Sequence, residues 1–159
     1  MKYAFLNELL PAYAPQVILD NSFSVIAFIK AIDSGNVEDF MVLLKAFYAS
    51  IPYDLEENRD KDEKYYQLIF YLLFTLMGQF VEAEVKSATD RADAVVKTAD
   101  SIYVFEFKMD ENATAADALA QINNKGYLIP YTADNRRLVK TGVAFSIQSK
   151  GVKEWIIEG

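Results

Sequence analysis

The chain has 159 residues, 52% of them hydrophobic and 14% aromatic, which is enough for one domain with a buried core. It contains neither cysteine nor histidine. This composition excludes disulfides, zinc sites built from Cys or His, and Ser-His-Asp catalysis. Any bound metal would need oxygen ligands, which suit magnesium or manganese. A chain without cysteine is expected in the cytoplasm.

The net charge of −7 argues against tight unaided binding to nucleic acid, because phosphate contacts supply most of the affinity of such proteins. One small basic group, Arg136, Arg137 and Lys140, is expected in a loop, either to contact phosphates or as a solvated turn. No membrane partner is expected. The most apolar run, residues 68–77, covers only about half the length that a bilayer requires.

The first sixty residues predict helices. An amphipathic segment spans residues 2–10, a second helix ends at Ser34-Gly35, and a third begins after Asn36 and ends near Ile51. Apolar residues recur at helical spacing in each of them, so each should bury one face.

A charged stretch, residues 54–62, marks the expected boundary between a helical lead-in at 1–60 and a second domain at 61–159. Beyond it, helical and strand-like patterns alternate. The predicted elements are a helix at 62–77, strands at 79–86, 91–97 and 101–108, a helix from Asn112 or Thr114 to Gly126, and strands at 138–147 and 151–157. The predicted fold class is mixed α/β, in the order α-β-β-β-α-β-β.

The strand at residues 101–108 carries the residues from which a function can be predicted. Side chains at alternate positions of a strand share a face, so Glu106 and Lys108 point to one side while Phe105 and Phe107 pack on the other. Asp93 lies on the preceding strand, across a tight turn, where its carboxylate can approach that of Glu106. Two carboxylates can hold a hard divalent cation and an ammonium can orient water, as phosphodiester hydrolysis requires.

This pattern, Asp93 followed after twelve residues by Glu106-Phe107-Lys108, resembles the signature of the PD-(D/E)xK nuclease superfamily. A longer string, formed by residues 91–93, 102–108, 118–122 and 125–127, looks like the nuclease-like domain that follows an AAA-ATPase-like domain in bacterial proteins. The resemblance spans about residues 61–157. It implies a restriction-endonuclease-like core, preceded here by a helical extension.

The resemblance also implies a role for individual residues. Asp93 and Glu106 would ligate Mg²⁺ or Mn²⁺, and Lys108 would position the attacking water. Glu63 matches a helical acidic residue that supports metal binding, and Gln121 matches a glutamine near the active site of related nucleases. Both have an ordinary alternative: Glu63 could cap or solvate its helix, and Gln121 could satisfy a backbone group.

The sequence departs from the family pattern at two positions beside the predicted site. Asp90 stands where relatives commonly have glycine, and Ala92 replaces the signature proline. Neither change removes a ligand. A second ExK triplet, Glu84-Val85-Lys86, is interpreted as a solvated strand edge, because no aspartate on a preceding strand accompanies it.

The expected function is hydrolysis of nucleic acid by a magnesium- or manganese-dependent nuclease domain. The implied partners are nucleic acid, DNA before RNA, and an AAA-ATPase-like domain. The sequence has no G-x-x-x-x-G-K-[ST] phosphate loop, so that domain is expected elsewhere in a longer parent chain. Two alternatives stay open: a catalytically silent module that binds a partner or the ATPase domain, and a toxin- or defence-related effector on the same fold.

Overall fold

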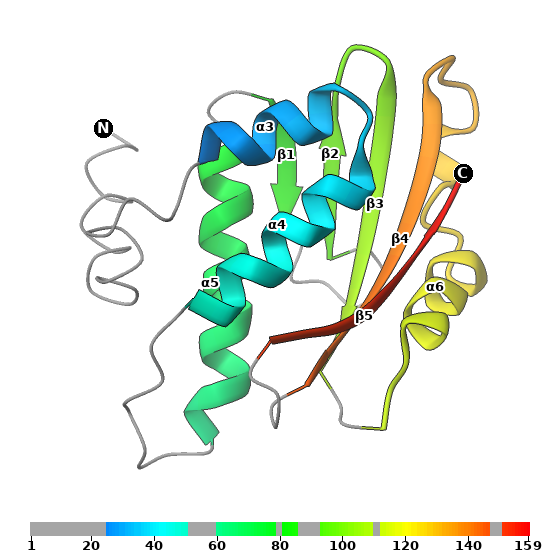
Figure 1. Ribbon diagram of the computed structural model, residues 1–159. Coiled ribbons are helices and arrows are strands. Elements are labelled where there is room, and N and C mark those ends of the chain that lie inside the picture. The colour runs from blue at the N-terminus through cyan, green and yellow to red at the C-terminus, as the bar shows by residue number, and fades with distance from the viewer. Residues whose placement is uncertain (1–24, 51–59, 79–80, 86–92, 110–111, 147–150) are drawn as a thin grey trace.

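The computed structural model describes residues 25–50, 60–78, 81–85, 93–109, 112–146 and 151–159 (Figure 1). The predicted segment at residues 2–10 lies outside these ranges. The elements are helices α3 (Val25–Asp33), α4 (Val37–Ser50), α5 (Asp60–Met77) and α6 (Ala115–Asn124), the 3-10 helix η1 (Ile129–Tyr131), and strands β1 (Glu82–Val85), β2 (Ala94–Lys97), β3 (Ser101–Lys108), β4 (Arg137–Ser146) and β5 (Gly151–Glu158). The mixed α/β class is confirmed.

Side-chain caps fix the start of two helices. The Asn36 Oδ1 atom accepts a hydrogen bond of 3.1 Å from the backbone N–H of Asp39, as expected for the cap of α4. Helix α6 starts with a capping box, in which Thr114 and Asp117 each accept a bond from the other's backbone N–H. Thr114, one of the two predicted caps, is therefore the one used. Gly126, with a φ of 65°, follows the end of this helix.

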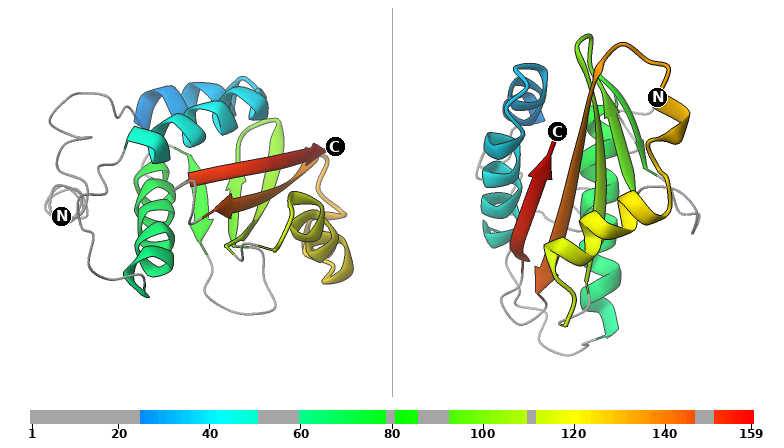
Figure 2. Two further views of the ribbon diagram at one scale, coloured as in Figure 1. Left: turned by 60° about the horizontal axis from the view of Figure 1, so that its bottom comes forward. Right: turned by 90° about the vertical axis from the view of Figure 1, so that its right-hand side faces the viewer.

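The five strands form one mixed sheet in the order β1-β2-β3-β4-β5. Strands β3 and β4 pair in parallel, and the other neighbours pair in antiparallel fashion. A parallel pair needs a crossover connection, which here contains α6 and η1. Helices α3, α4 and α5 cover one face of the sheet and α6 covers the other (Figure 2).

The main core lies between the sheet and the three N-terminal helices. Phe105 and Phe107 on β3 contact aromatic rings of α5: the ring centroids of Phe70 and Phe107 are 4.7 Å apart, and those of Phe74 and Phe105 are 5.5 Å apart. This places both β3 phenylalanines on the face predicted for them. A smaller cluster lies beneath α6 and contains Val95, Ile102, Val104, Ile122 and Tyr127. The sheet, with β3 at its centre, therefore lies between a large aromatic core on one face and a smaller apolar cluster on the other.

Helices α3 and α4 bury side chains in the same cluster as α5 and the sheet, among them Ile32, Phe40 and Leu44. The division of the chain at residue 60 stays a prediction, because residues 51–59 lie outside the described part. Within the ranges that the structure describes, no helix combines the length and the apolar character needed to span a bilayer.

Candidate active site at the end of strand β3

The hairpin of β2 and β3 brings Asp93 opposite Glu106. Its turn is closed by a backbone hydrogen bond of 2.9 Å from Thr98 to Ser101. The register pairs Ala94 with Phe105. Asp93 immediately precedes β2 instead of belonging to it as predicted, and continuing this register by one residue places it opposite Glu106 on the same face. The predicted hairpin thus brings the two acidic residues together.

The Asp93 carboxylate is tied to the neighbouring strand. Its Oδ2 atom accepts a hydrogen bond of 2.9 Å from the backbone N–H of Phe107. Phe107 lies between Glu106 and Lys108 in the chain, so this bond holds the Asp93 carboxylate beside the two charged side chains of β3. A hydrogen bond of this kind fixes one carboxylate oxygen and leaves the other available as a ligand.

Glu106 is a buried acid, with only 4% of its surface exposed. Its Oε1 atom accepts a hydrogen bond of 2.5 Å from the Gln121 side chain, and the Lys108 ammonium lies 3.9 Å from the same oxygen. Its Oε2 atom is also buried and has no hydrogen-bond partner. A buried carboxylate oxygen without a partner is costly, which marks it as a position for a ligand.

Gln121 connects the side chains of the site. Its Oε1 atom accepts a hydrogen bond from Lys108, and its Nε2 atom donates to Glu106 and, over 3.1 Å, to the hydroxyl of Tyr127. A flipped amide would place its oxygen against the Glu106 carboxylate and its nitrogen against the ammonium, so the neighbours define its orientation. The partners of the Gln121 side chain are thus Lys108, Glu106 and Tyr127, and none of these contacts is to a backbone group.

Tyr127 is a member of this network that the sequence did not reveal. It is 6% exposed and packs in the cluster beneath α6. It belongs to the string 125–127 that carries part of the family resemblance, but nothing in the local sequence indicates that its hydroxyl contacts Gln121. The turn at Gly126, which reverses the chain after α6, brings it back to the helix.

The electrostatic environment makes both carboxylates costly to ionise. The pKa of Glu106 is raised from 4.5 to about 7, first by burial and then by the negative charge of Asp93, while Lys108 acts in the opposite direction. Burial also raises the pKa of Asp93, against the hydrogen bond from Phe107 and the charge of Lys108. A cation beside both groups would relieve this repulsion.

The pair fits a hard divalent cation. Both side chains offer oxygen atoms as ligands, and the Oε2 atom of Glu106 makes no hydrogen bond of ordinary length and angle. No group of three or more acidic, His or Cys side chains that could hold a metal occurs among the described residues. Water or phosphate would therefore complete the coordination. Glu63 lies in the first turn of α5 with its side chain outside the described part, so its predicted role stays a prediction.

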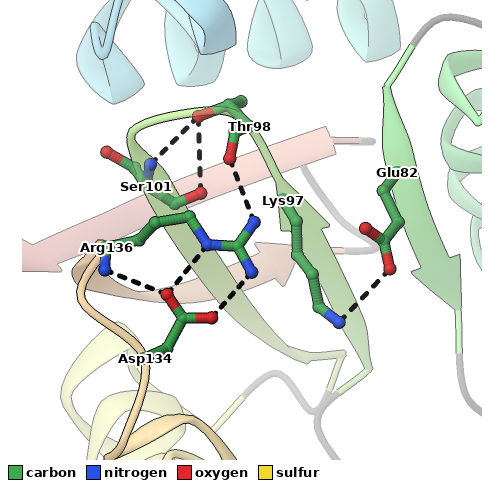
Figure 3. Close-up of polar contacts among 6 residues, drawn as sticks. All are labelled: Glu82, Lys97, Thr98, Ser101, Asp134 and Arg136. Carbon is green, nitrogen blue, oxygen red and sulfur yellow. Dashed lines mark hydrogen bonds and ion pairs between the residues drawn. The ribbon is translucent and has the colours of Figure 1, made fainter.

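The three residues of the predicted basic group are paired within the chain, and Figure 3 shows one of them, Arg136, beside the turn between β2 and β3. Arg136 contacts Asp134 over 2.7 Å and donates to the carbonyl of Thr98 over 3.1 Å. Further pairs join Lys97 to Glu82, Arg137 to the carbonyl of Gly159, and Lys140 to Glu158. Arg137 and Lys140 belong to β4, so the expectation of a basic loop was wrong for them.

Residues 61–155 match the family model of the PD-(D/E)XK nuclease superfamily, and the chain belongs to this superfamily. An uncharacterized protein from the vnfD 5′ region of Azotobacter chroococcum mcd 1 is 36% identical over 118 residues. The match covers 73% of this chain but only 23% of that relative. The chain thus spans less than a quarter of the length of that relative.

Proposed function

We propose that the chain hydrolyses phosphodiester bonds of nucleic acid with Mg²⁺ or Mn²⁺ held by Asp93 and Glu106, assisted by Glu63. The observation that carries this proposal is the buried Oε2 atom of Glu106, which has no partner although its carboxylate lies opposite a second acid. A fold selected only for stability would be expected to satisfy or remove such a group. The superfamily supplies the reaction class.

Each residue of the site has a separate role in the proposed reaction. Lys108 would hold the attacking water or a phosphate oxygen, because an ammonium has three donors and its contact with Gln121 uses one. Gln121 would keep this ammonium and Glu106 Oε1 in a fixed relation. A bound divalent cation would neutralise charge at the phosphate and lower the pKa of water.

The partners are proposals of the same kind. The superfamily supports nucleic acid as the substrate, and DNA before RNA is our proposal. An AAA-ATPase-like domain in a cytoplasmic parent protein is proposed from the family resemblance, and the length of the Azotobacter relative outside the match leaves room for such a domain. A further domain would also help an acidic chain to approach a polyanion.

The test is a cleavage assay on single- and double-stranded DNA and RNA, with Mg²⁺, Mn²⁺ or a chelator. We expect cleavage that needs metal and falls at least about a hundredfold in Asp93→Asn and Glu106→Gln. Asp134→Asn is the matched control, since it makes the same chemical change in a carboxylate that pairs with Arg136 away from the site. Cleavage that is unchanged in both site variants would refute the proposal.

A catalytically silent module is the second candidate. The observation that favours it is the pairing of Lys97 on β2, Arg136 just before β4 and Lys140 on β4 with acids of the same chain, which neutralises these basic charges. This candidate predicts that the wild type cleaves none of the four substrates. It also predicts that calorimetry finds the same Mn²⁺ binding, or none, in the wild type and in Glu106→Gln.

A further inference from the structure

Helix α6 touches the sheet with its backbone at Gly142. A Cβ added at this glycine would lie 2.4 Å from the carbonyl oxygen of Ala115 and 2.6 Å from the backbone nitrogen of Leu119. Both are main-chain atoms, so no side-chain rotation could make room. The φ of Gly142 is not among the positive values found at the described glycines, so it is the missing side chain that matters here.

This contact lies beside the candidate active site. Gly142 on β4 pairs with Glu106 on β3. Leu119, which lies over Gly142, precedes Gln121 by two residues on α6. The distance between the sheet and the helical turn that contains Leu119 and Gln121 therefore determines whether the Gln121 amide can reach the Glu106 carboxylate. The amide donates to this carboxylate over 2.5 Å.

A second contact holds the start of the same helix. The Oε1 atom of Glu154 on β5 accepts a hydrogen bond of 2.9 Å from the backbone N–H of Ala115. Glu154 pairs with Ala144 on β4, which in turn pairs with Lys108, so this bond is formed at the level of the ammonium. Ala115 is thus held twice, through its N–H by Glu154 and through the approach of its carbonyl to Gly142.

We propose that Gly142 and Glu154 are positioning residues for the nuclease site. Together they seat α6 on the sheet at the depth that puts the Gln121 amide between Lys108 and Glu106. This inference rests on the proposed function. It adds that the strand pair β4–β5, which supplies no metal ligand in that proposal, controls the geometry of the site through the backbone of α6.

Gly142→Ala tests the first contact. The added methyl must displace α6, so the Gln121 side-chain amide signal in a ¹⁵N-correlated NMR spectrum should move. Mn²⁺-dependent kcat should fall about tenfold to a hundredfold with KM changed much less, since a displacement of about 1 Å can have such an effect. Gly151→Ala on β5 is the matched control, because its Cβ would meet only an ordinary contact of 3.4 Å to Tyr48.

Glu154→Met tests the second contact and covers the case that Gly142→Ala fails to fold. It should move the same amide signal and lower kcat, whereas Glu154→Gln, which keeps a carbonyl acceptor for Ala115, should restore both. Glu158→Met is the matched control, because Glu158 is an exposed acid on the same strand as Glu154 and pairs with Lys140 of β4.

The amide signal separates the two proposals, because it needs no catalysis. If the wild type is inactive on every substrate, the proposed function fails while the spectrum still tests the seating of α6. If Gly142→Ala or Glu154→Met folds and keeps the wild-type Gln121 signal, the positioning role is overturned. A loss of kcat with an unmoved Gln121 signal would also overturn it.

Discussion

The carboxylate of Glu106 and the amide of Gln121 are joined by a hydrogen bond of 2.5 Å, although one side chain comes from the central strand β3 and the other from helix α6. The helix that carries the chain from β3 to β4 therefore also reaches the acid beside Asp93. The charge state of Glu106 depends on this neighbour, since the bond from Gln121 favours the ionised form.

Mn²⁺ should raise the melting temperature of the wild type, because a cation that binds only the folded chain stabilises it by about 2.7 kcal/mol at a hundredfold excess over Kd. Glu106→Gln should remove most of this rise, since it deletes the charge beside Asp93 and the unpartnered Oε2 ligand. Differential scanning calorimetry with and without Mn²⁺ measures the effect. Equal shifts in the two proteins would place the metal elsewhere.

The stability of the metal-free protein should fall as the pH rises from about 4.5 to above 7 relative to Glu106→Gln. The folded state raises the pKa of Glu106 from 4.5 to about 7, so the protonated acid favours folding below the lower value and this contribution is lost through the upper one. The full shift of the Glu106 pKa corresponds to a change of about 3 kcal/mol in the free energy of unfolding. Urea unfolding of both proteins across this pH range gives the difference, and parallel curves would contradict it.

The affinity for Mn²⁺ should also depend on the ionisation of Glu106. Below about pH 7 the cation must displace a proton from Glu106, so its affinity should weaken as the pH falls. Calorimetric titrations in buffers of different ionisation enthalpy report the released proton. Proton release that persists in Glu106→Gln would assign it to another group.

Lys108→Met should lower turnover at least about a hundredfold and leave Mn²⁺ binding in place, because it removes the ammonium while both carboxylates stay. Phe107→Ala is the contrasting variant on the adjacent position. Its ring stacks on Phe70 in the main core, so its loss should cost about 3–5 kcal/mol of stability. An active enzyme that is indifferent to Lys108→Met would remove this lysine from the mechanism.

Tyr127→Phe should lower kcat several-fold, because Gln121 loses one of its acceptors and the amide is held less firmly; a hydrogen bond contributes about 1 kcal/mol. Tyr103→Phe is the matched control. Its hydroxyl donates to the carbonyl of Ile32 over 3.1 Å on the opposite face of the sheet, so it should reduce stability and leave kcat unchanged. The reverse pattern would separate Tyr127 from the site.

The elements of the site that lie close in sequence could be predicted from the sequence. Alternation along β3 separates Glu106 and Lys108 from Phe105 and Phe107, and a tight turn brings the strand of Asp93 alongside. These inferences need only the strand period and one hairpin. The aromatic residues of β3 then define which face the three N-terminal helices must cover.

The contacts made across the β3–β4 crossover could not be predicted in the same way. The role of Tyr127 depends on the turn after α6, and those of Gly142 and Glu154 depend on where the helix lies over β4 and β5. No local sequence pattern encodes how closely α6 approaches β4 and β5. Among the described residues, Val81 and Asp93 precede β1 and β2 instead of belonging to them, and the other outer residues of the two predicted strands lie outside the described part.

The alternation of β3 has a consequence for mutation by insertion or deletion. Because successive side chains face opposite layers, removing a single residue between positions 101 and 105 would exchange the two sets downstream of the change. Glu106 and Lys108 would then be driven into the aromatic layer under α5, and Phe107 would take their place beneath α6. The same error would destroy the core and the candidate site together, so this strand should accept substitutions far more readily than changes in its length.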